Sequence, residues 1–301
     1  MRFALIALPA LAIATASPAA KAPVHHAPAK SAAQPASTQH VTVDPEIAKA
    51  VDDPARKADN RARDKYRHPA QTLSFFGLKP DMTVVEMLPG GGWYSEILAP
   101  YLAAGGHFVA AVPPGKSTDS FRAVLASDTA RYGKAEVTPF IEGQPNQLVP
   151  DGTADMVLTF RNIHNLLGSA GQPGDGNAPQ AFADWFRVLK PGGVLGIEEH
   201  RLPETMDGAR EKTTGYVKRS TVIRLAMAAG FQFVGASDIN ANAKDDHDHP
   251  KGVWTLPPTY DLGEQDKSKY AAIGESDRMT LKFAKPDPNA PAPASPAPDA
   301  H

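Results

Sequence analysis

Several residues of this chain have the types and positions that a ligand-binding site needs. Glu86 stands at the end of an apolar run, and Pro89, Gly90, Gly91 and Gly92 follow it closely. Glycines remove the side chains that would keep a ligand from the backbone, and the N-terminus of a following helix favours a negative group. We therefore expect a ligand at this turn. A tight strand-to-helix turn without a ligand is the plain alternative.

Two histidines are candidate general bases. His164 comes shortly after the apolar run Met156–Phe160, and His200 follows the run that ends at Glu198. Imidazole exchanges a proton near neutral pH, so either histidine could deprotonate an acceptor group. A hydrogen-bonded structural role is the alternative for both.

The segment Asp245–His249 is dense in aspartate and histidine. Oxygen and imidazole ligands at this density could bind a divalent cation. Such loops are more often solvated, so we predict no metal site. The apolar segment Gly252–Pro258 that follows is interpreted as a strap that packs back on the domain or covers the site.

Strand-like and helix-like patterns alternate from residue 82 onward, which predicts a doubly wound, mostly parallel α/β sheet with helices on both faces. The predicted strands are 82–87, 107–112, 136–140, 156–160, 194–198, 231–236 and 279–283, with helices 94–104, 118–127, 179–189 and 221–229. Ligands of such sheets bind at the carboxyl ends of the strands. Glu86, His164 and His200 all lie at such ends.

Three polar helices are expected before the first strand. Asp44-Pro45 and Asp53-Pro54 each look like an N-cap followed by proline at the first helical position, and Ala70–Phe76 forms the third helix. Arg67-His68 could fold over the mouth of the site as a lid or simply connect two helices. A long insertion, 238–278, separates the last two strands, and long connections are often functional.

The two ends of the chain differ from its middle in composition. Arg2 and the apolar run Phe3–Ala14 precede small residues, which predicts a signal peptide over 1–22 and a periplasmic or secreted protein. That run is too short for a comfortable membrane span, so no stable span is expected after cleavage. Residues rich in Ala and Pro at 23–43 and 286–301 are predicted to be flexible, which places the domain at 44–285.

Charge and cysteine content exclude several classes of protein. The formal net charge is −2 with acids and bases spread along the chain, so no nucleic-acid-binding face is expected. Cysteine is absent, which excludes disulfides and thiolate metal sites. A small-molecule substrate is the expected partner.

A dinucleotide is the first ligand to consider for the glycine turn. Gly90, Gly92 and Ser95 nearly match the G-x-G-x-x-G pattern. The acid that would hold the ribose is missing, because the second strand runs into Pro113 and Pro114. An NAD-dependent oxidoreductase is therefore disfavoured.

A second segment, Arg187-Val188-Leu189-Lys190-Pro191-Gly192-Gly193, resembles the signature before the fifth strand of class I S-adenosylmethionine-dependent methyltransferases. Ala154–Phe160 is similar to their fourth-strand motif, and Gly230–Val234 to the strand entry that closes their fold. Arg161-Asn162 is similar to the quinone-ring methylases of that family. The resemblance covers 73–285 apart from the insertion.

The resemblance implies a Rossmann-like, seven-stranded sheet, S-adenosylmethionine as cofactor, and methyl transfer to a small-molecule or cell-envelope acceptor. It implies these cofactor-binding residues: Glu86, Pro89, Gly90, Gly91, Gly92, Arg161 and Asn162. The chain departs from the family at Leu88, where glycine is usual, and at Pro113 and Pro114, where an acid usually ends the second strand. The acid often found after the third strand, near the adenine, is also not obvious, and Glu142 and Gln144 are the nearest polar substitutes. The missing acid of the second strand favours the alternative function, an exported methyltransferase-fold protein that binds a ligand without catalysis.

Overall fold

The structure is a computed structural model that describes residues 41–290. The predicted signal peptide, most of the predicted linker and the last eleven residues lie outside this range. Within the described residues, no helix is long and apolar enough to cross a membrane.

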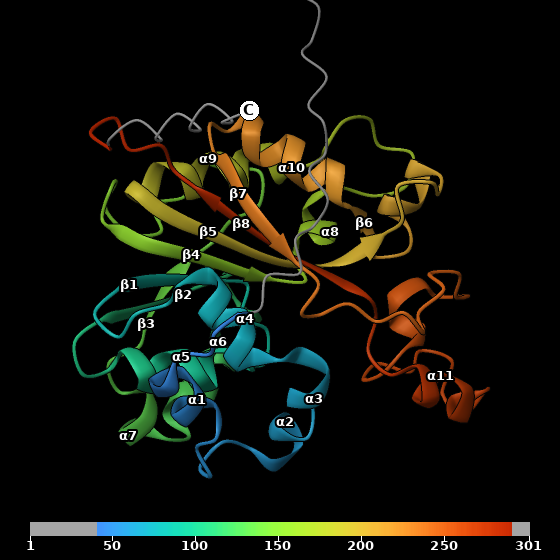
Figure 1. Cartoon of the computed structure of the whole chain (residues 1–301), viewed down its shortest axis with the longest axis horizontal. Coiled ribbons are helices and arrows are strands. Elements are labelled where there is room, and N and C mark those ends of the chain that lie inside the picture. The colour runs from blue at the N-terminus through green and yellow to red at the C-terminus, as the bar shows by residue number, and fades with distance from the viewer. Residues whose placement is uncertain (1–40, 291–301) are drawn as a thin grey trace, which may run out of the picture. The chain divides into compact units, whose positions relative to one another are not determined.

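Seven strands form one sheet in the order β3-β2-β1-β4-β5-β8-β7 (Figure 1). The strands are β1 (Thr83–Met87), β2 (His107–Val112), β3 (Glu136–Pro139), β4 (Ala154–Phe160), β5 (Leu189–Leu202), β7 (Gln232–Ser237) and β8 (Arg278–Ala284). Neighbours pair in parallel except β8, which is antiparallel to both β5 and β7. A short strand, β6 (Val217–Lys218), pairs with the end of β5. The doubly wound, mostly parallel sheet is confirmed.

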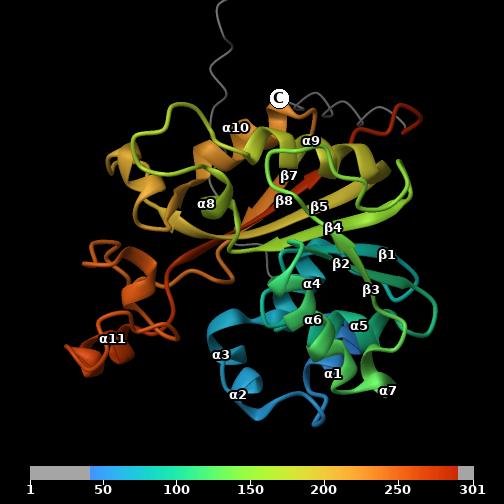
Figure 2. The same ribbon diagram turned by 180° about the vertical axis from the view of Figure 1, so that it is seen from behind.

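Helices cover both faces of the sheet (Figures 1 and 2). Alternate residues of β1 join different cores: Val85 and Met87 pack in the cluster that contains α9 and α10, and Val84 in the cluster of α1, α4, α5 and α6. The helices are α1 (Pro45–Val51), α2 (Ala58–Arg61), α3 (Asp64–Arg67), α4 (Pro69–Phe76), α5 (Ser95–Leu102), α6 (Lys116–Ala126), α7 (Thr129–Tyr132), α8 (Ile163–Leu166), α9 (Ala178–Val188) and α10 (Arg219–Ala228).

The structure corrects two sequence predictions. The helix expected after Asp53-Pro54 is instead two short helices, α2 and α3. Arg56, which precedes both, turns inward, donates to the Val51 carbonyl at 2.6 Å and pairs with Asp64. Strand β5 is much longer than 194–198, since its pairing with β8 extends from Val194 to His200.

The insertion between β7 and β8 contains a 3₁₀ turn, η2 (Gly252–Thr255), and α11 (Lys267–Ile273); another 3₁₀ turn, η1 (Gly208–Lys212), follows β5. In both views α11 lies away from the helices that cover the sheet faces (Figures 1 and 2). The chain returns from the insertion through Glu275 and Ser276 into β8. This return brings insertion residues to the site described next.

Candidate functional site

Three adjoining cavities lie at the carboxyl ends of the strands. The turn cavity, about 300 Å³, is lined by Asn60, Arg63, Arg67, Glu86–Gly91, Trp93, Tyr94 and Phe160–Asn162. The outer cavity, about 790 Å³, is lined by Leu88–Gly91, Val112, Pro113, Lys116, Ser117, Ser120, Glu142, Asn162 and Asn165. The strap cavity, about 290 Å³, is lined by Arg67, Arg161, His164, Asn165, His200, Val253, Trp254, Pro257–Thr259, Glu275 and Ser276. Shared lining residues show that the turn cavity adjoins both others.

The glycine turn is open toward the cavities. Gly90 has a φ of +57° and Gly92 a φ of +80°, conformations that favour glycine. A Cβ atom added to Gly90 or Gly91 would meet no atom within 4 Å. The turn therefore exposes the backbone of Pro89, Gly90 and Gly91 to the cavities, whereas Gly92 lines none of the three and its added Cβ atom would meet Val124 and Phe121. Leu88 adopts a φ of +52°, which explains why glycine is usual at this position in the family.

Glu86 lines the turn cavity as a buried carboxyl group. Burial raises the pKa of Glu86 to about 7, while the Ser95 hydroxyl, which donates to Oε2 at 2.5 Å, and Arg161 act in the opposite direction. A buried carboxyl of this kind gains most from a cationic partner such as an ammonium group. The structure thus places Glu86 where the sequence predicts a cofactor residue.

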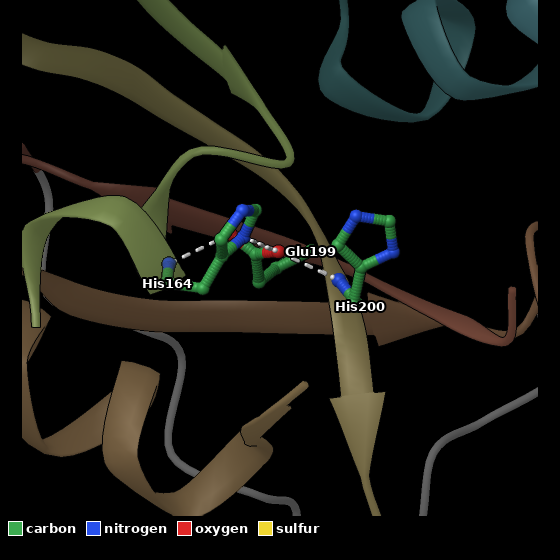
Figure 3. Close-up of side chains that lie close together, drawn as sticks. All are labelled: His164, Glu199 and His200. Atoms are coloured by element: carbon green, nitrogen blue, oxygen red, sulfur yellow. Dashed lines mark hydrogen bonds and ion pairs between the residues drawn. The ribbon is translucent and has the colours of Figure 1, made fainter. Parts of the chain in front are cut away.

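His164 and His200 come together around the carboxylate of Glu199 (Figure 3). His164 lies on α8, and its Nδ1–H donates to Glu199 Oε1 at 3.0 Å. The ring centroids of His164 and His200 are 5.3 Å apart, and His200 Nδ1 lies 2.6 Å from Ser276 Oγ. Burial, with His164 and Arg161 nearby, lowers the pKa of His200 well below its usual value, so this ring stays neutral.

Glu199 acts as a scaffold for this pair. Its Oε2 accepts the backbone N–H groups of Ile163 at 2.5 Å and His164 at 3.4 Å, and its Oε1 also accepts the N–H of His200 at 2.8 Å. The ligand atoms of His164, Glu199 and His200 lie within 4.8 Å of one another, close enough for one metal ion. The carboxylate is nevertheless occupied by donors, so the arrangement suits a histidine of fixed tautomer better.

A network of arginines and glutamates borders the turn cavity and the strap cavity. Glu275 accepts from Arg63 Nε at 2.7 Å and Arg67 Nε at 3.0 Å, and pairs with Arg278 Nη1 at 3.1 Å. Arg278 Nη1 also lies 3.0 Å from Glu198 Oε1. Burial opposes ionisation, yet Arg67 and Arg278 lower the pKa of Glu275 to about 2, so it is charged.

Arg161 and Asn162 follow β4 and differ in what they do. Arg161 lines both the turn and the strap cavities. The Asn162 amide instead donates to the Met87 carbonyl at 3.1 Å and to Thr159 Oγ1 at 3.3 Å, which fixes the end of β1. Asn162 thus borders the cavities, but its amide group forms its hydrogen bonds within the protein.

Sequence reasoning missed part of the site. Arg63, Trp93, Tyr94, Glu198 and Glu275 were not singled out, although all lie in the network or line the cavities. Their proximity depends on contacts between distant segments, which no local pattern reports. The sequence did single out two other parts of the wall, the strap Gly252–Pro258 and Arg67-His68, and Arg67 is a buried wall residue.

The solvated loop expected at Asp245–His249 is wrong for two of its residues, since Asp246 and Asp248 are exposed but Asp245 and His249 are not. Asp245 and His249 are buried, and the Asp245 carboxylate accepts from the Tyr216 hydroxyl at 2.8 Å, from His249 Nε2 at 2.9 Å and from the Asp277 N–H at 2.7 Å. This buried cluster is satisfied by its own hydrogen bonds. It anchors the insertion to the start of β8.

Comparison with known proteins identifies the fold. No protein-family model matches the chain, and no curated protein matches it. Among solved structures it is similar to a SAM-dependent methyltransferase from Aquifex aeolicus, with 18% identity, a TM-score of 0.50, and coverage of 81% of this chain and 100% of that one. It is also similar to the cyclase SpnF, with 16% identity, a TM-score of 0.50, and coverage of 76% and 82%. The protein therefore has the class I methyltransferase fold, as its strand order also indicates.

Glu86→Gln tests the buried carboxyl group. Because the folded-state pKa is raised from 4.5 to about 7, ionisation of Glu86 costs stability as pH rises through that window. Above about pH 7.5 we expect Glu86→Gln to be more stable than the wild type by about 2–3 kcal/mol, with little difference below about pH 4.5. Urea denaturation across pH measures this.

Glu264→Gln is the control for that comparison, because its side chain is 86% exposed. Its stability should follow the wild type at every pH. Parallel curves for Glu86→Gln and the wild type would contradict the raised pKa.

Proposed function

We propose that the protein transfers a methyl group from S-adenosylmethionine to a small-molecule acceptor. One observation carries the proposal: the open glycine turn and the His164–Glu199 pair line adjoining cavities at the carboxyl ends of the strands. That edge is where ligands bind in doubly wound folds. The cofactor would occupy the turn and outer cavities, and the acceptor the strap cavity.

The residues of the turn cavity fit the amino-acid half of this cofactor. Glu86 would pair with its ammonium group, and Arg63, whose Nη2 is buried without a hydrogen-bond partner in the described part of the chain, offers a donor for its carboxylate. Gly91 leaves space where a side chain would intrude. When bound, the cofactor supplies a methyl group on a sulfonium, which passes to the acceptor and leaves a neutral thioether.

The outer cavity fits the nucleoside half in an unusual way. No acid ends β2, where Val112 and Pro113 line the wall instead. Glu142, which the sequence suggested as a substitute for the acid near the adenine, lines this cavity together with Ser120. These two side chains are the candidates for the ribose hydroxyls. Gln144, the other suggested substitute, is not among the lining residues.

His164 is the proposed general base. Because Nδ1–H donates to Glu199, the lone pair on Nε2 remains free to accept a proton from an acceptor hydroxyl in the strap cavity. His200, held neutral, lies beside it and adds no charge. Most of the remaining rate acceleration would come from holding the acceptor in line with the methyl group.

A ligand-binding protein without catalysis is the second candidate. The missing acid after β2 favours it, since the usual partner of the ribose is absent. The likeness to the cyclase SpnF is consistent with a fold that serves more than one function. Binding of the cofactor without methyl transfer to any acceptor would distinguish it.

We also propose that the protein acts in the periplasm or outside the cell. Arg2, the apolar run after it and the small residues near Ala16 support this. Expressed in its own cell type, the mature chain should be recovered outside the cytoplasm with its N-terminus near residue 17 or 21. A chain that keeps Met1 or Arg2 and stays in the cytoplasm would contradict it.

Gly91→Asp tests the cofactor site. Calorimetric titration should show saturable binding of S-adenosylhomocysteine to the wild type. Gly91→Asp should lose at least about tenfold in affinity, because its carboxylate enters the cavity next to the cofactor's own carboxylate.

Gly235→Asp is the matched control, since Gly235 also has open space around it but lies on β7. It should bind like the wild type. Equal binding by Gly91→Asp, or no binding by the wild type, would refute the proposed site.

His164→Ala tests the base. Transfer of labelled methyl groups to a small-molecule extract should fall by about 10²–10⁴-fold, while S-adenosylhomocysteine affinity stays unchanged. His107→Ala, which removes a half-exposed partner of Glu136 at the start of β2, should retain full transfer. Transfer at the wild-type rate by His164→Ala would exclude it as the base.

A further inference from the structure

One arginine in the site is only loosely paired: Arg161 Nη1 lies 3.7 Å from Glu198 Oε1. Arg161 follows β4 with a φ of +61°, and its backbone N–H donates to the Glu198 carbonyl at 2.7 Å. A non-glycine residue in this conformation is strained, and such strain is concentrated at functional sites. The backbone thus holds Arg161 at the junction of the turn and strap cavities, both of which it lines.

The other guanidinium groups nearby form shorter ion pairs, and Arg63, whose Nη2 is also buried without a hydrogen-bond partner among the described residues, lines the turn cavity and not the strap cavity. Arg63 and Arg67 hold Glu275, and Arg278 lies between Glu275 and Glu198. Within residues 41–290, Arg161 Nη1 is buried without a hydrogen-bond partner, and its nearest carboxylate oxygen, on Glu198, is 3.7 Å away. A buried charged donor of this kind gains strongly from an anionic acceptor atom.

The carboxylates around the cavities do not supply a close acceptor for Arg161 Nη1. Glu275 and Glu198 are engaged by other arginines, and Tyr94 donates to Glu198 at 3.0 Å. Glu199 accepts several donors of its own and faces His164. The carboxyl of Glu86 is the group proposed to meet the cofactor ammonium. One positive charge, on Arg161, is left to face the strap cavity.

Part of the lining of the strap cavity is apolar. Val253, Trp254, Pro257 and Pro258 contribute to it, and the Trp254 ring stands edge-on to His164 with centroids 5.9 Å apart. A cavity of about 290 Å³ with such a lining suits a flat ring. Arg161 and His164 line the same cavity.

Resting on the proposed function, we propose that the acceptor is a small hydroxylated aromatic acid whose carboxylate pairs with Arg161. The apolar part of the lining packs on the ring, Arg161 binds the carboxylate and His164 faces the hydroxyl group. Arg161 is thus a specificity residue for the acceptor. The methyl transfer itself is the one described above.

The test compares a carboxylate with its neutral isostere. Binding of 3-hydroxybenzoate and 3-hydroxybenzamide to the full chain is measured by calorimetry, with and without saturating S-adenosylhomocysteine. The wild type should bind the carboxylate at least about tenfold more tightly than the amide. Arg161→Gln should reduce this preference to less than about twofold, and Arg161→Lys should keep part of it.

Arg224→Gln is the matched control, since Arg224 pairs with Asp175 on the surface and lines none of the three cavities. It should keep the wild-type preference, and melting curves should show that every variant is folded. If Arg161→Gln fails to fold, the test rests on Arg161→Lys, whose preference for the carboxylate over the amide should lie below that of the wild type. Equal binding of acid and amide, or no binding of either, by the wild type overturns the inference.

A second comparison separates the acceptor from the cofactor. If Arg161 binds the cofactor carboxylate instead, Arg161→Gln weakens S-adenosylhomocysteine but not methylthioadenosine, which lacks the amino acid, and the acid preference is unchanged. That result overturns the inference and leaves the proposed function intact. Failure of the wild type to bind S-adenosylhomocysteine would refute the proposed function. The preference for the carboxylate over the amide, measured without S-adenosylhomocysteine, would still test the role of Arg161.

Discussion

The buried ion pairs of Glu198 and Glu275 with Arg67 and Arg278 hold together the parts of the site that come from different segments. Arg67 ends α3, Glu198 belongs to β5, and Glu275 and Arg278 mark the return from the insertion into β8. Removing one member of such a buried network leaves an uncompensated charge and typically costs about 3–5 kcal/mol. Among these residues, Arg67 lines both the turn cavity and the strap cavity, and Glu275 lines the strap cavity. The cavities therefore depend on charge pairing as much as on apolar packing.

This network also explains how a polar site survives at the edge of an apolar sheet. The carboxyl ends of β1, β4 and β5 bring Glu86, Arg161 and Glu199 close to two dense cores. Each of these polar groups is stabilised in a different way in its buried position. Glu199 accepts backbone donors, while the raised pKa of Glu86 lets it remain neutral. Arg161 lacks a close partner, and this exception is what points to an acceptor.

The sequence predicts most of the fold because strand and helix periodicities are local. The runs 82–87 and 107–112 and the turn at Pro89–Gly92 have the expected structure, whereas Lys190–Gly193, expected to precede the fifth strand, belong to β5. The break between α2 and α3 escapes prediction, as does the inward turn of Arg56 to Val51 and Asp64.

The candidate site is predictable only in part. Glu86, His164 and His200 stand at strand ends and are visible in the sequence. The pairing of Glu275 with Arg63 spans most of the chain, so it emerges only once the tertiary structure is known. Asp245 is a similar case. Its acidic segment predicts a solvated loop, and its hydrogen bond with Tyr216 is known only from the tertiary structure.

The most direct test of the central claim is a crystal structure of the protein with S-adenosylhomocysteine. The account predicts that the ligand lies along Pro89–Gly92, with its ammonium at Glu86, its ribose toward Glu142 and its sulfur facing the strap cavity near His164. A ligand bound elsewhere, or one whose sulfur points away from His164, would contradict it.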